Sequence, residues 1–237
     1  METQRQGTEE VWNMKASIII AVLNSHEVVN RQLRHFKGII PNNCEVIIID
    51  DGSEPSITFN EKIDYRLKLF ATHDERPWSQ PCARNRGAEI AQSEYVLMTD
   101  IDHVFSEEAI NAVVNFNGDK MVFPRQWAVL SDEGKIIQDP EVLFEYGLDT
   151  ELYKQRGLHA GQHANTFAMK KILYDMLGGY KESFCGKYGG DDTDFARRYG
   201  ELHYKGLAKR HVHGPAIYVY PNPRKDVKGL FHKLRFK

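Results

Sequence analysis

The chain has 237 residues, of which 41% are hydrophobic and 27% are charged, and its formal net charge is −2. This composition is typical of a folded, soluble protein with a sizeable core, and it gives no reason to expect a disordered chain. The nearly balanced charge gives no reason to expect nucleic-acid binding, and no apolar run is long enough to span a bilayer.

Two features of the sequence predict the cellular compartment. The three cysteines, Cys44, Cys82 and Cys185, are odd in number and include no CxxC pair. We therefore expect neither a disulfide framework nor a thiolate zinc site. Residues 1–15 form a polar leader that lacks the cationic start and apolar stretch of a signal peptide. Both features favour a reducing, cytoplasmic location.

The first half of the chain alternates predicted strands and helices. The runs ASIIIAVLN and CEVIIIDDGS are rich in β-branched residues, as buried strands are, and apolar residues at helical spacing follow the first run. The predicted strands are at 16–24, 44–53, 66–73 and 94–100, and the predicted helices are at 26–36 and 82–93. This alternation predicts an α/β fold built on a parallel sheet with crossover helices.

The alternation weakens after residue 117. Further strands are predicted at 120–130, 134–138 and 164–171. A long glycine-rich loop begins at residue 178 and runs into a short predicted helix at an acidic cluster. We therefore expect the second half to be more antiparallel and richer in loops.

Polar side chains follow the ends of the predicted parallel strands. Ligands of parallel α/β proteins bind beyond the carboxyl ends of the strands. The residues at these ends are Asn24, Asp50, Asp51, Asp100 and Asp102. For the DDGS segment a plain turn is the alternative, because Asp and Gly commonly form turns.

Asp100 and Asp102, in the segment TDIDH, indicate a metal site. In an extended segment, side chains two residues apart point the same way, and two carboxylates repel unless a cation binds. Oxygen ligands suit Mg²⁺ or Mn²⁺, which commonly also hold substrate phosphates. His211 or His213 could add an imidazole and so favour Mn²⁺, and solvated histidines are the alternative.

A second acidic cluster, formed by Asp191, Asp192 and Asp194, follows the segment GKYGG. One interpretation is a helix N-terminus with acidic residues in its first turn. The other is an aspartate that acts as general base on a hydroxyl group, with glycines that let a ligand approach beside Tyr188. The second interpretation predicts an acceptor site.

The ordered set of motifs resembles a known enzyme family. The blocks SIIIAVLN, VIIIDDGS, ARNRGAEIAQSEYVLMTDID, TFAMKK…GGYKESF and YGGDDTDFARR are similar in order and spacing to those of inverting family 2 glycosyltransferases with the GT-A fold. The resemblance covers roughly residues 16–213. It implies one GT-A (Rossmann-like) domain, with a mostly parallel sheet, helices on both faces and a smaller antiparallel, loop-rich part on the acceptor side.

The chain divides into four parts, and the resemblance implies roles for the two middle ones. The parts are the polar leader (1–15), a nucleotide-sugar-binding half (16–117), an acceptor and catalytic half (118–215) and a basic C-terminal segment (216–237). The implied donor-binding residues are Ala21, Asn24, Asp50, Asp51, Arg84 and Asp100, with Asp51 closer to the base than Asp50. Arg84 would lie near the donor phosphates or ribose.

The remaining implied roles concern the metal and the acceptor. The metal ligands would be Asp102 of the DxD motif and His213, with Asp100 and His211 as alternatives. Asp192 would be the catalytic base, and the acceptor would contact Tyr188, Gly190 and Asp191. The flat faces of Trp78 and Trp127, together with His163 and Asn165, are further candidates for sugar contacts.

The implied activity is a metal-dependent transfer of a hexose-type sugar from a nucleotide-diphosphate sugar, with UDP as the expected nucleotide, to a hydroxyl group. The cofactor would be Mn²⁺ or Mg²⁺, the acceptor a carbohydrate as in polysaccharide biosynthesis, and a single displacement would invert the anomeric centre. Two alternatives remain from the residues. One is a haloacid-dehalogenase-like phosphatase with an aspartate nucleophile in TDIDH, and the other is a non-catalytic nucleotide-sugar-binding module.

The C-terminal segment predicts a contact of its own. Residues 225–237 place apolar side chains on one helical face among lysines and arginines. Such a segment can lie on anionic lipid as a peripheral membrane contact, and packing onto the enzyme's own surface is the alternative.

Overall fold

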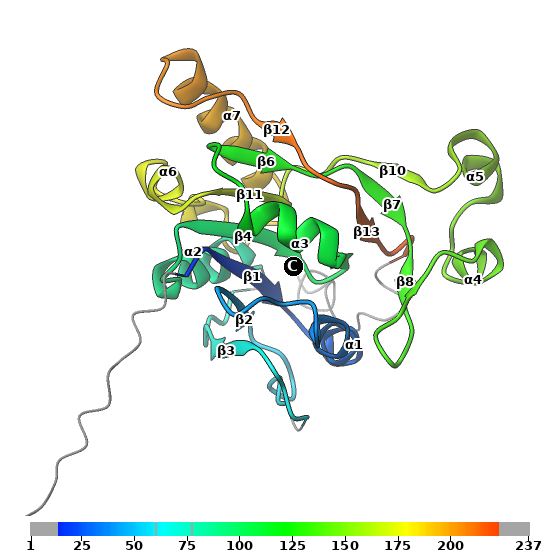
Figure 1. Cartoon of the computed structure of the whole chain (residues 1–237). Coiled ribbons are helices and arrows are strands. Elements are labelled where there is room, and N and C mark those ends of the chain that lie inside the picture. The colour runs from blue at the N-terminus through cyan, green and yellow to red at the C-terminus, as the bar shows by residue number, and fades with distance from the viewer. Residues whose placement is uncertain (1–13, 60, 77, 223–237) are drawn as a thin grey trace, which may run out of the picture.

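The structure is a computed structural model of the chain, and it describes residues 14–59, 61–76 and 78–222 (Figure 1). In chain order the elements are β1 (Ala16–Val22), α1 (His26–Phe36), β2 (Cys44–Asp50), β3 (Arg66–Ala71), α2 (Gln80–Ile90), β4 (Tyr95–Asp100), β5 (His103–Val104), α3 (Glu107–Val114), β6 (Lys120–Val122), β7 (Arg125–Trp127), β8 (Val129–Leu130), β9 (Ile136–Ile137), α4 (Pro140–Glu145), α5 (Thr150–Arg156), β10 (His159–Gly161), β11 (Phe167–Lys170), α6 (Lys171–Met176), the 3₁₀ turn η1 (Glu182–Phe184), α7 (Asp191–Tyr204), β12 (Val212–His213) and β13 (Ile217–Val219).

A seven-stranded sheet in the order β12-β6-β11-β4-β1-β2-β3 forms the centre of the molecule. The neighbours β3, β2, β1 and β4 run parallel, β11 runs antiparallel to both β4 and β6, and β12 is parallel to β6. The β-branched runs that predicted β1 and β2 are buried at every position, as expected for strands covered on both faces. The predicted mostly parallel α/β sheet is confirmed.

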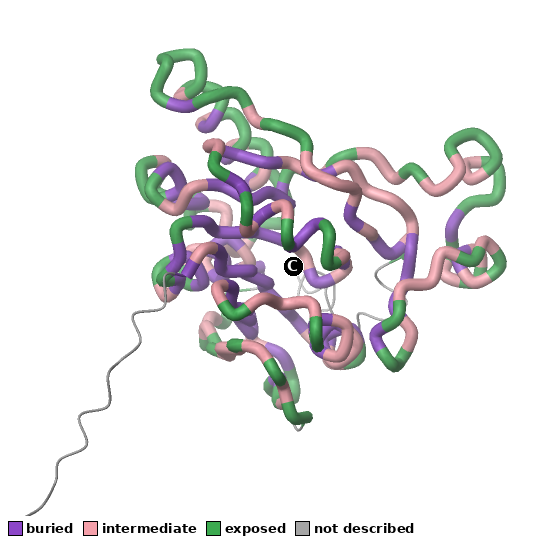
Figure 2. Tube along the Cα trace, in the orientation of Figure 1, coloured by how far each residue is buried: buried purple, intermediate pink, exposed green. Residues whose placement is uncertain are grey.

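Alternate residues of β1 show that helices cover both faces of this sheet. Ile18 and Ile20 pack in one apolar cluster with α1 and α3, whereas Ile19 and Ala21 pack in a second cluster with α2, α6 and α7. Because side chains alternate along a strand, the two clusters lie on opposite faces. The central strands are accordingly buried, and exposed residues gather on the peripheral helices and loops (Figure 2).

Helix α2 packs unusually close to the sheet because of Gly87. A Cβ atom at this position would collide with the side chain of Ile19 and lie 3.4 Å from that of Ile49. Only a residue without a side chain allows this approach. The close packing brings Gln80 and Arg84 of α2 to Asp100 at the carboxyl end of β4.

The second cluster also buries a lysine. Lys120 of β6 is 6% exposed, and its amine lies 4.5 Å and 4.6 Å from the ring centroids of Phe167 and Tyr199. Burial lowers the pKa of this amine to about 8. The aromatic rings provide an electrostatic attraction that partly offsets the loss of hydration.

The smaller part of the fold contains the sheet β10-β7-β13-β5 and the hairpin β8-β9. In the four-stranded sheet two of the three pairs are antiparallel, and β8 and β9 are antiparallel as well. This agrees with the predicted antiparallel, loop-rich second half.

Several short helices were not predicted. They are α3, α4, α5 and α6, of six to eight residues each. Asp139 and Asp149 cap α4 and α5 through bonds from the backbone N–H groups of Glu141 and Leu152, so the capping signals were present in the sequence. The acidic helix α7 has 14 residues and is longer than predicted.

No helix in the described part of the chain combines the length and apolar character needed to cross a membrane. The predicted basic segment 225–237 and most of the predicted leader lie outside the described residues. Their predicted roles stay predictions.

Candidate active site

The carboxyl ends of β1, β2 and β4 bring three motifs to one edge of the sheet. Val22 of β1 is in register with Asp50 of β2, and Ala21 is in register with Asp100 of β4. The DDGS turn and the TDIDH turn therefore flank the end of β1. This is the edge where ligands of parallel sheets bind.

The two aspartates of DDGS have different surroundings. The carboxylate of Asp50 accepts hydrogen bonds from the backbone N–H groups of Ser53 (2.8 Å) and Ile57 (2.9 Å) and so holds the turn. Asp51 accepts hydrogen bonds from the hydroxyl groups of Ser79 and Thr72. Both carboxylates are more than 90% buried. Asp50 has a structural task in this turn, which fits the prediction that Asp51 is the closer of the two to a base.

Asn24 joins the end of β1 to the same turn. Its backbone N–H donates to the Ser53 hydroxyl at 2.8 Å, and its side-chain oxygen accepts from the Glu54 N–H at 2.7 Å. Its φ of 50° lies in the left-handed region, where asparagine is better tolerated than most residues. These two hydrogen bonds thus fix the backbone of the predicted donor pocket.

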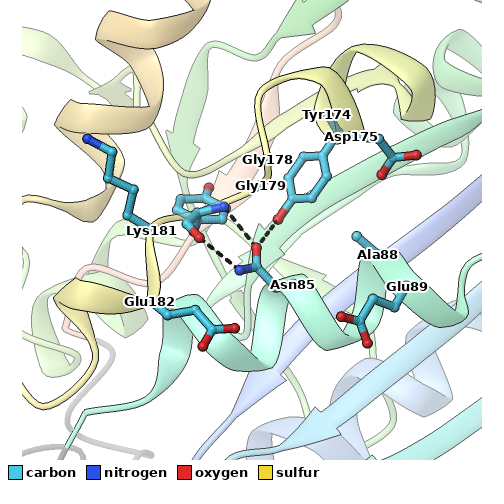
Figure 3. Close-up of a pocket in the computed structure, with 10 residues that line it drawn as sticks. Asn85, Ala88, Glu89, Tyr174, Asp175, Gly178, Gly179, Lys181 and Glu182 are labelled. Carbon is cyan, nitrogen blue, oxygen red and sulfur yellow. Dashed lines mark hydrogen bonds between the residues drawn. The ribbon is translucent and has the colours of Figure 1, made fainter.

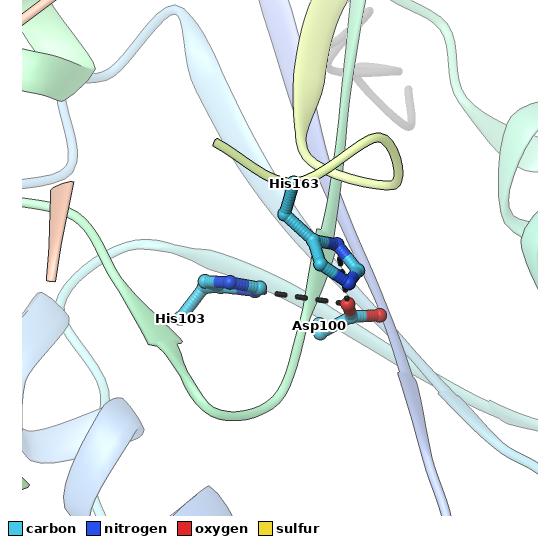
Figure 4. A group of neighbouring side chains, drawn as sticks. All are labelled: Asp100, His103 and His163. Carbon is cyan, nitrogen blue, oxygen red and sulfur yellow. Dashed lines mark ion pairs between the residues drawn. The ribbon is translucent and has the colours of Figure 1, made fainter. Parts of the chain in front are cut away.

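The TDIDH turn gathers two carboxylates and two imidazoles. Asp100 Oδ2 lies 3.5 Å from His163 Nδ1 and 3.7 Å from His103 Nδ1, and Asp102 Oδ1 lies 3.8 Å from the same His103 nitrogen. Asp100, His103 and His163 offer ligand atoms that all lie within 4.8 Å of one another. Figure 4 shows the two rings converging on the Asp100 carboxylate. This donor set fits a divalent cation such as Mn²⁺.

The neighbouring charges shift the pKa values of this group in opposite directions. Burial and the charge of Asp100 raise the pKa of Asp102 to about 7. Despite its burial, the pKa of Asp100 is held below its usual value by Arg84 and the two histidines. Burial lowers the pKa of His103 to about 3. A cation at this turn would offset the burial and the charge of Asp100 and so favour the ionised form of Asp102.

Arg84 connects this turn to the acidic cluster of α7. Its side chain has no exposed surface, it forms an ion pair with Asp100 Oδ1, and its Nη1 lies 3.5 Å from Asp191 Oδ2. Nε and Nη1 of Arg84 and Oδ2 of Asp191 are buried and have no hydrogen-bond partner of good geometry within the part of the chain that the structure describes. The guanidinium therefore faces the two carboxylates, and its contact with donor phosphates stays a prediction.

The three acids at the start of α7 differ in their surroundings. Asp191 is 3% exposed, and burial raises the pKa of its carboxyl group. Asp194 forms ion pairs with Lys181, Arg197 and Arg198, which gives it a structural role. Asp192 is partly exposed, and its carboxylate accepts a 2.7 Å bond from the Thr193 N–H. Of the three acids, Asp192 is therefore the one that an external hydroxyl group could reach.

The glycine-rich loop before α7 is packed against the start of α2. Tyr188 is 60% exposed, and its ring forms an edge contact with Trp78 at 4.8 Å between centroids. Gly190 has a φ of 88°, and a Cβ there would lie 3.0 Å from the Phe184 ring. The exposed face of Tyr188 fits the predicted acceptor contact.

No disulfide framework was expected from the sequence, and the described residues form a single disulfide that was not foreseen. Cys82 of α2 and Cys185, which follows η1, are joined by a disulfide, and Cys44 is a buried free thiol. The backbone N–H of Gly186 also donates to the carbonyl of Trp78. Folding brings the two cysteines together although 103 residues separate them in the sequence. An odd cysteine count leaves room for one pair and one thiol.

The same loop is tied to α2 at a second point (Figure 3). The side-chain nitrogen of Asn85 donates to the carbonyl of Tyr180, and its oxygen accepts from the Tyr180 N–H and from the Tyr174 hydroxyl, each at 2.8 Å. A hollow of about 430 Å³ lies beside these contacts, between α2, α6 and residues 178–182. These bonds position the loop that leads to Asp191 and Asp192.

The predicted ligands His213, in β12, and His211, just before it, lie at the edge of the central sheet. His213 is exposed, and its Nδ1 lies 3.0 Å from the side-chain nitrogen of Gln162. The His211 ring lies 5.5 Å from the His213 ring. Among the described residues, no ion pair joins either ring to Asp100 or Asp102. The imidazoles that the structure places beside Asp100 are instead those of His103 and His163.

Three further residues of this edge were not singled out from the sequence. His103 directly follows the DxD motif, and that position was the available signal. Arg125 donates to His103 Nε2 at 3.0 Å, and Gln32 of α1 donates to the carbonyls of Ile101 (2.8 Å) and His103 (2.6 Å). Nothing in the local sequence around Gln32 or Arg125 predicts these contacts.

The other candidate sugar contacts are largely enclosed. Trp127 is partly buried, and its indole N–H has no hydrogen-bond partner among the described residues. Asn165 is 7% exposed and accepts a bond from the Tyr180 hydroxyl at 3.1 Å. Asn165 therefore helps to hold the loop that carries His163.

Comparison with known proteins places this arrangement in a family. The model described as glycosyl transferase family 2 matches residues 17–177, more than half of the chain. An uncharacterized glycosyltransferase of Haemophilus influenzae is 34% identical over 104 residues, which is 42% of this chain and 41% of that protein. EpsH of Bacillus subtilis is 28% identical over 174 residues, 71% of this chain and 49% of EpsH. The chain thus spans less than half the length of these relatives.

Solved structures with a similar fold include a mannosyltransferase and S. aureus TarS. The mannosyltransferase PcManGT from Pyrobaculum calidifontis, in complex with GDP-Man and Mn²⁺, aligns with a TM-score of 0.54 and 16% identity over 87% of this chain and 56% of its own. S. aureus TarS 1-349 in complex with UDP aligns with a TM-score of 0.53 and 17% identity over 87% and 60%. These likenesses show the GT-A fold. With the family match over residues 17–177, they establish that the chain belongs to glycosyltransferase family 2.

Proposed function

We propose that the protein is a metal-dependent, inverting glycosyltransferase that moves a sugar from a UDP-sugar to a hydroxyl group of a carbohydrate. The observation that carries the proposal is the ion-pair chain from Asp100 through the buried Arg84 to Asp191. It joins the DxD turn to the start of α7, so a donor at the strand ends and an acceptor at α7 would meet. UDP is proposed because the similar TarS structures hold UDP and UDP-GlcNAc, although PcManGT holds GDP-Man.

The donor would lie over the carboxyl ends of β1, β2 and β4. We assign Asp51 and the backbone around Asn24 to the base and ribose, and Asp100 to the sugar or ribose. A divalent cation held by Asp100, Asp102 and an imidazole of this edge would neutralise charge on the leaving nucleoside diphosphate. Mn²⁺ is proposed over Mg²⁺ because the available ligands mix carboxylates with imidazole.

Asp192 is the proposed general base. Its carboxylate takes the proton of the acceptor hydroxyl group while the hydroxyl oxygen forms a bond to the anomeric carbon. The bond from that carbon to the diphosphate oxygen breaks on the opposite face, so the configuration inverts. Asp191 is buried against Arg84 and cannot easily reach the acceptor as a base, so we assign it to positioning the start of α7 and the acceptor.

A donor screen tests this proposal. The full chain is incubated with UDP- and GDP-sugars and Mn²⁺, and release of the nucleoside diphosphate is measured with and without oligosaccharide acceptors. Asp192→Asn should lower turnover by about 10²- to 10⁴-fold, the usual contribution of a general base, while UDP affinity is kept. Asp175→Asn is the matched control, because Asp175 forms a surface pair with Lys171 on α6.

The same screen separates the alternatives. A non-catalytic module would bind UDP but release nothing in any reaction, and Asp192→Asn would then change nothing. A phosphatase would release inorganic phosphate from phosphate esters. Membership of family 2 favours the transferase over both.

A further inference from the structure

We infer that His163, rather than His213, is the imidazole ligand of the divalent cation, together with Asp100 and Asp102. The inference rests on the proposed function and names the ligand set of its metal site. It follows from the hydrogen-bonding state of the imidazoles near the TDIDH turn and from the way the loop that carries His163 is held.

One oxygen of Asp100 is already occupied. Oδ1 accepts hydrogen bonds from the Arg84 guanidinium and, at 3.1 Å, from the side-chain nitrogen of Gln80. Oδ2 faces His163 and His103 at 3.5 and 3.7 Å. Oδ2 is therefore the oxygen that remains for a cation, and the cation must share its neighbourhood with these two rings.

Neither ring nitrogen of His103 is available to bind a cation. An arginine can only donate, so the contact of 3.0 Å from Arg125 Nη1 makes His103 Nε2 the acceptor. The proton of the neutral ring is then on Nδ1, which lies 3.2 Å from the hydroxyl group of Thr166 and 3.7 Å from Asp100 Oδ2. With one nitrogen accepting and the other protonated, His103 orients its neighbours and binds no metal.

His163 is free of this restriction. Its side chain is 35% exposed, and its Nδ1 is the imidazole nitrogen closest to Asp100 Oδ2. The Asn165 N–H lies 3.4 Å from the same nitrogen, a long contact that a stronger ligand would displace. A metal-binding histidine needs one unprotonated nitrogen and access for the cation, and His163 has both.

The loop that carries His163 is held on both sides. The guanidinium of Arg125 donates to the carbonyls of Gly161 (3.0 Å) and of Ala160 and Gln162 (3.3 Å each), so the group that orients His103 also fixes this loop. After His163, Asn165 is bound by the Tyr180 hydroxyl group. The ring is therefore presented to Asp100 by a fixed backbone, as metal ligands require.

His213 lies in a less suitable place. Its Nδ1 contacts the side-chain nitrogen of Gln162, and no ion pair within the described ranges links it to either aspartate of the DxD motif. Its exposed position on the edge strand β12 leaves it outside the group formed by Asp100, His103 and His163.

Manganese binding to the full chain in the presence of UDP tests the assignment. Calorimetry gives the Mn²⁺ affinity, and pulsed electron paramagnetic resonance detects an imidazole nitrogen bound to Mn²⁺. His163→Ala should weaken Mn²⁺ binding at least about tenfold, since even outer-shell partners contribute that much, and should abolish the nitrogen signal. His163→Gln, which keeps the bulk of the ring, should also lose the signal, and thermal unfolding checks that both variants are folded.

His213→Ala is the matched comparison and should keep the nitrogen signal with an affinity changed less than about twofold. Loss of the signal in His213→Ala, or its retention in His163→Ala, would overturn the assignment while the proposed transfer reaction stands. A wild-type chain that turns over its donor in the presence of EDTA and binds no Mn²⁺ overturns the assignment as well. Absence of nucleotide binding and turnover in every condition would instead count against the proposed function.

Discussion

Arg84→Met is the variant that tests most directly how the site is held together. In the wild type the guanidinium has no exposed surface and lies between Asp100 and Asp191, whose side chains are only 16% and 4% exposed. Methionine fills similar space but supplies no charge. The variant therefore leaves two buried carboxylates facing each other without a cation.

The expected loss of stability follows from this burial. Removing one partner of a buried ion pair typically costs about 3–5 kcal/mol, because the remaining charge stays buried and uncompensated. Here two carboxylates are left, so we expect a value at the upper end of that range. Arg84→Met/Asp191→Asn should recover part of the loss, with an interaction energy of about 1–3 kcal/mol.

The pH dependence of the stability loss provides a second test of this explanation. In the wild type the pKa of Asp100 is lowered, with Arg84 as the main opposing charge to the burial of the carboxyl group. Without Arg84 the largest charge that opposes burial is lost, so the folded-state pKa values of Asp100 and Asp191 should rise above their unfolded values. A carboxyl group whose pKa is raised in the folded state stabilises that state at low pH, and this contribution is lost as the pH rises. The deficit of the variant should therefore be larger at pH 8 than at pH 5.

Urea unfolding followed by circular dichroism at pH 5, 6.5 and 8 measures these differences. Arg86→Met on the same helix is the control, because Arg86 forms an exposed pair with Glu89 and should change the stability by less than about 0.5 kcal/mol. A deficit for Arg84→Met below about 1 kcal/mol, or one that does not depend on pH, would refute the description of Arg84 as the bridge between the two acids.

Three further outcomes are expected. Lys120→Met should raise the free energy of unfolding at pH 7 by about 1–3 kcal/mol, because burial lowers the lysine pKa from 10.5 to about 8. The wild type regains this stability between pH 8 and 10.5, where the buried lysine is neutral, so the difference between the two proteins should disappear in unfolding curves above that range. A difference that does not depend on pH would contradict this explanation. Below pH 7 the Mn²⁺ affinity measured by calorimetry should fall about tenfold per pH unit, because Asp102, whose pKa is raised to about 7, must lose its proton to bind a cation; Asp102→Asn should weaken Mn²⁺ binding at every pH, and an affinity that does not change between pH 7 and pH 6 in the wild type would contradict the role of Asp102. Cys82→Ser, or reduction of the wild type, should lower the free energy of unfolding by about 2–4 kcal/mol in thermal or urea unfolding, because the disulfide joins residues 103 positions apart. Cys44→Ser, which leaves the disulfide intact, serves as the comparison. Equal stability of the reduced and oxidised wild type would rule out a contribution from the disulfide.

The parallel half of the fold was predictable because its signals are local. The β-branched runs of β1 and β2 are buried on both faces, and each ends in a turn with its own hydrogen bonds. A parallel sheet then requires that these ends meet at one edge. The positions of Asp51 and Asp100 beside the end of β1 follow from this rule, without any knowledge of side-chain contacts.

The contacts between the two halves of the site were not predictable in the same way. Arg84 reaches Asp191 only because Gly87 lets α2 lie close to the sheet and because Asn85 and the disulfide hold the loop before α7. The contacts of Arg84, Asn85 and Cys82 join residues about a hundred positions apart, and no periodicity in the sequence predicts them. The odd number of cysteines argued only against a framework of several disulfides, whereas the structure contains a single one.

The histidines show how motif spacing and three-dimensional arrangement can select different residues. The chain has ten histidines, and similarity to the family favoured His213 because it follows the acidic block. The structure places His163 beside Asp100 because β10 pairs with β7, and Arg125 of β7 holds both the loop after β10 and His103. One arginine therefore determines which ring remains able to bind a cation. Arg125→Lys keeps the charge but cannot donate to His103 and to three carbonyls in the same fixed geometry. That substitution should therefore weaken the Mn²⁺ binding measured by calorimetry, although the arginine contacts no ligand atom of the proposed metal site directly.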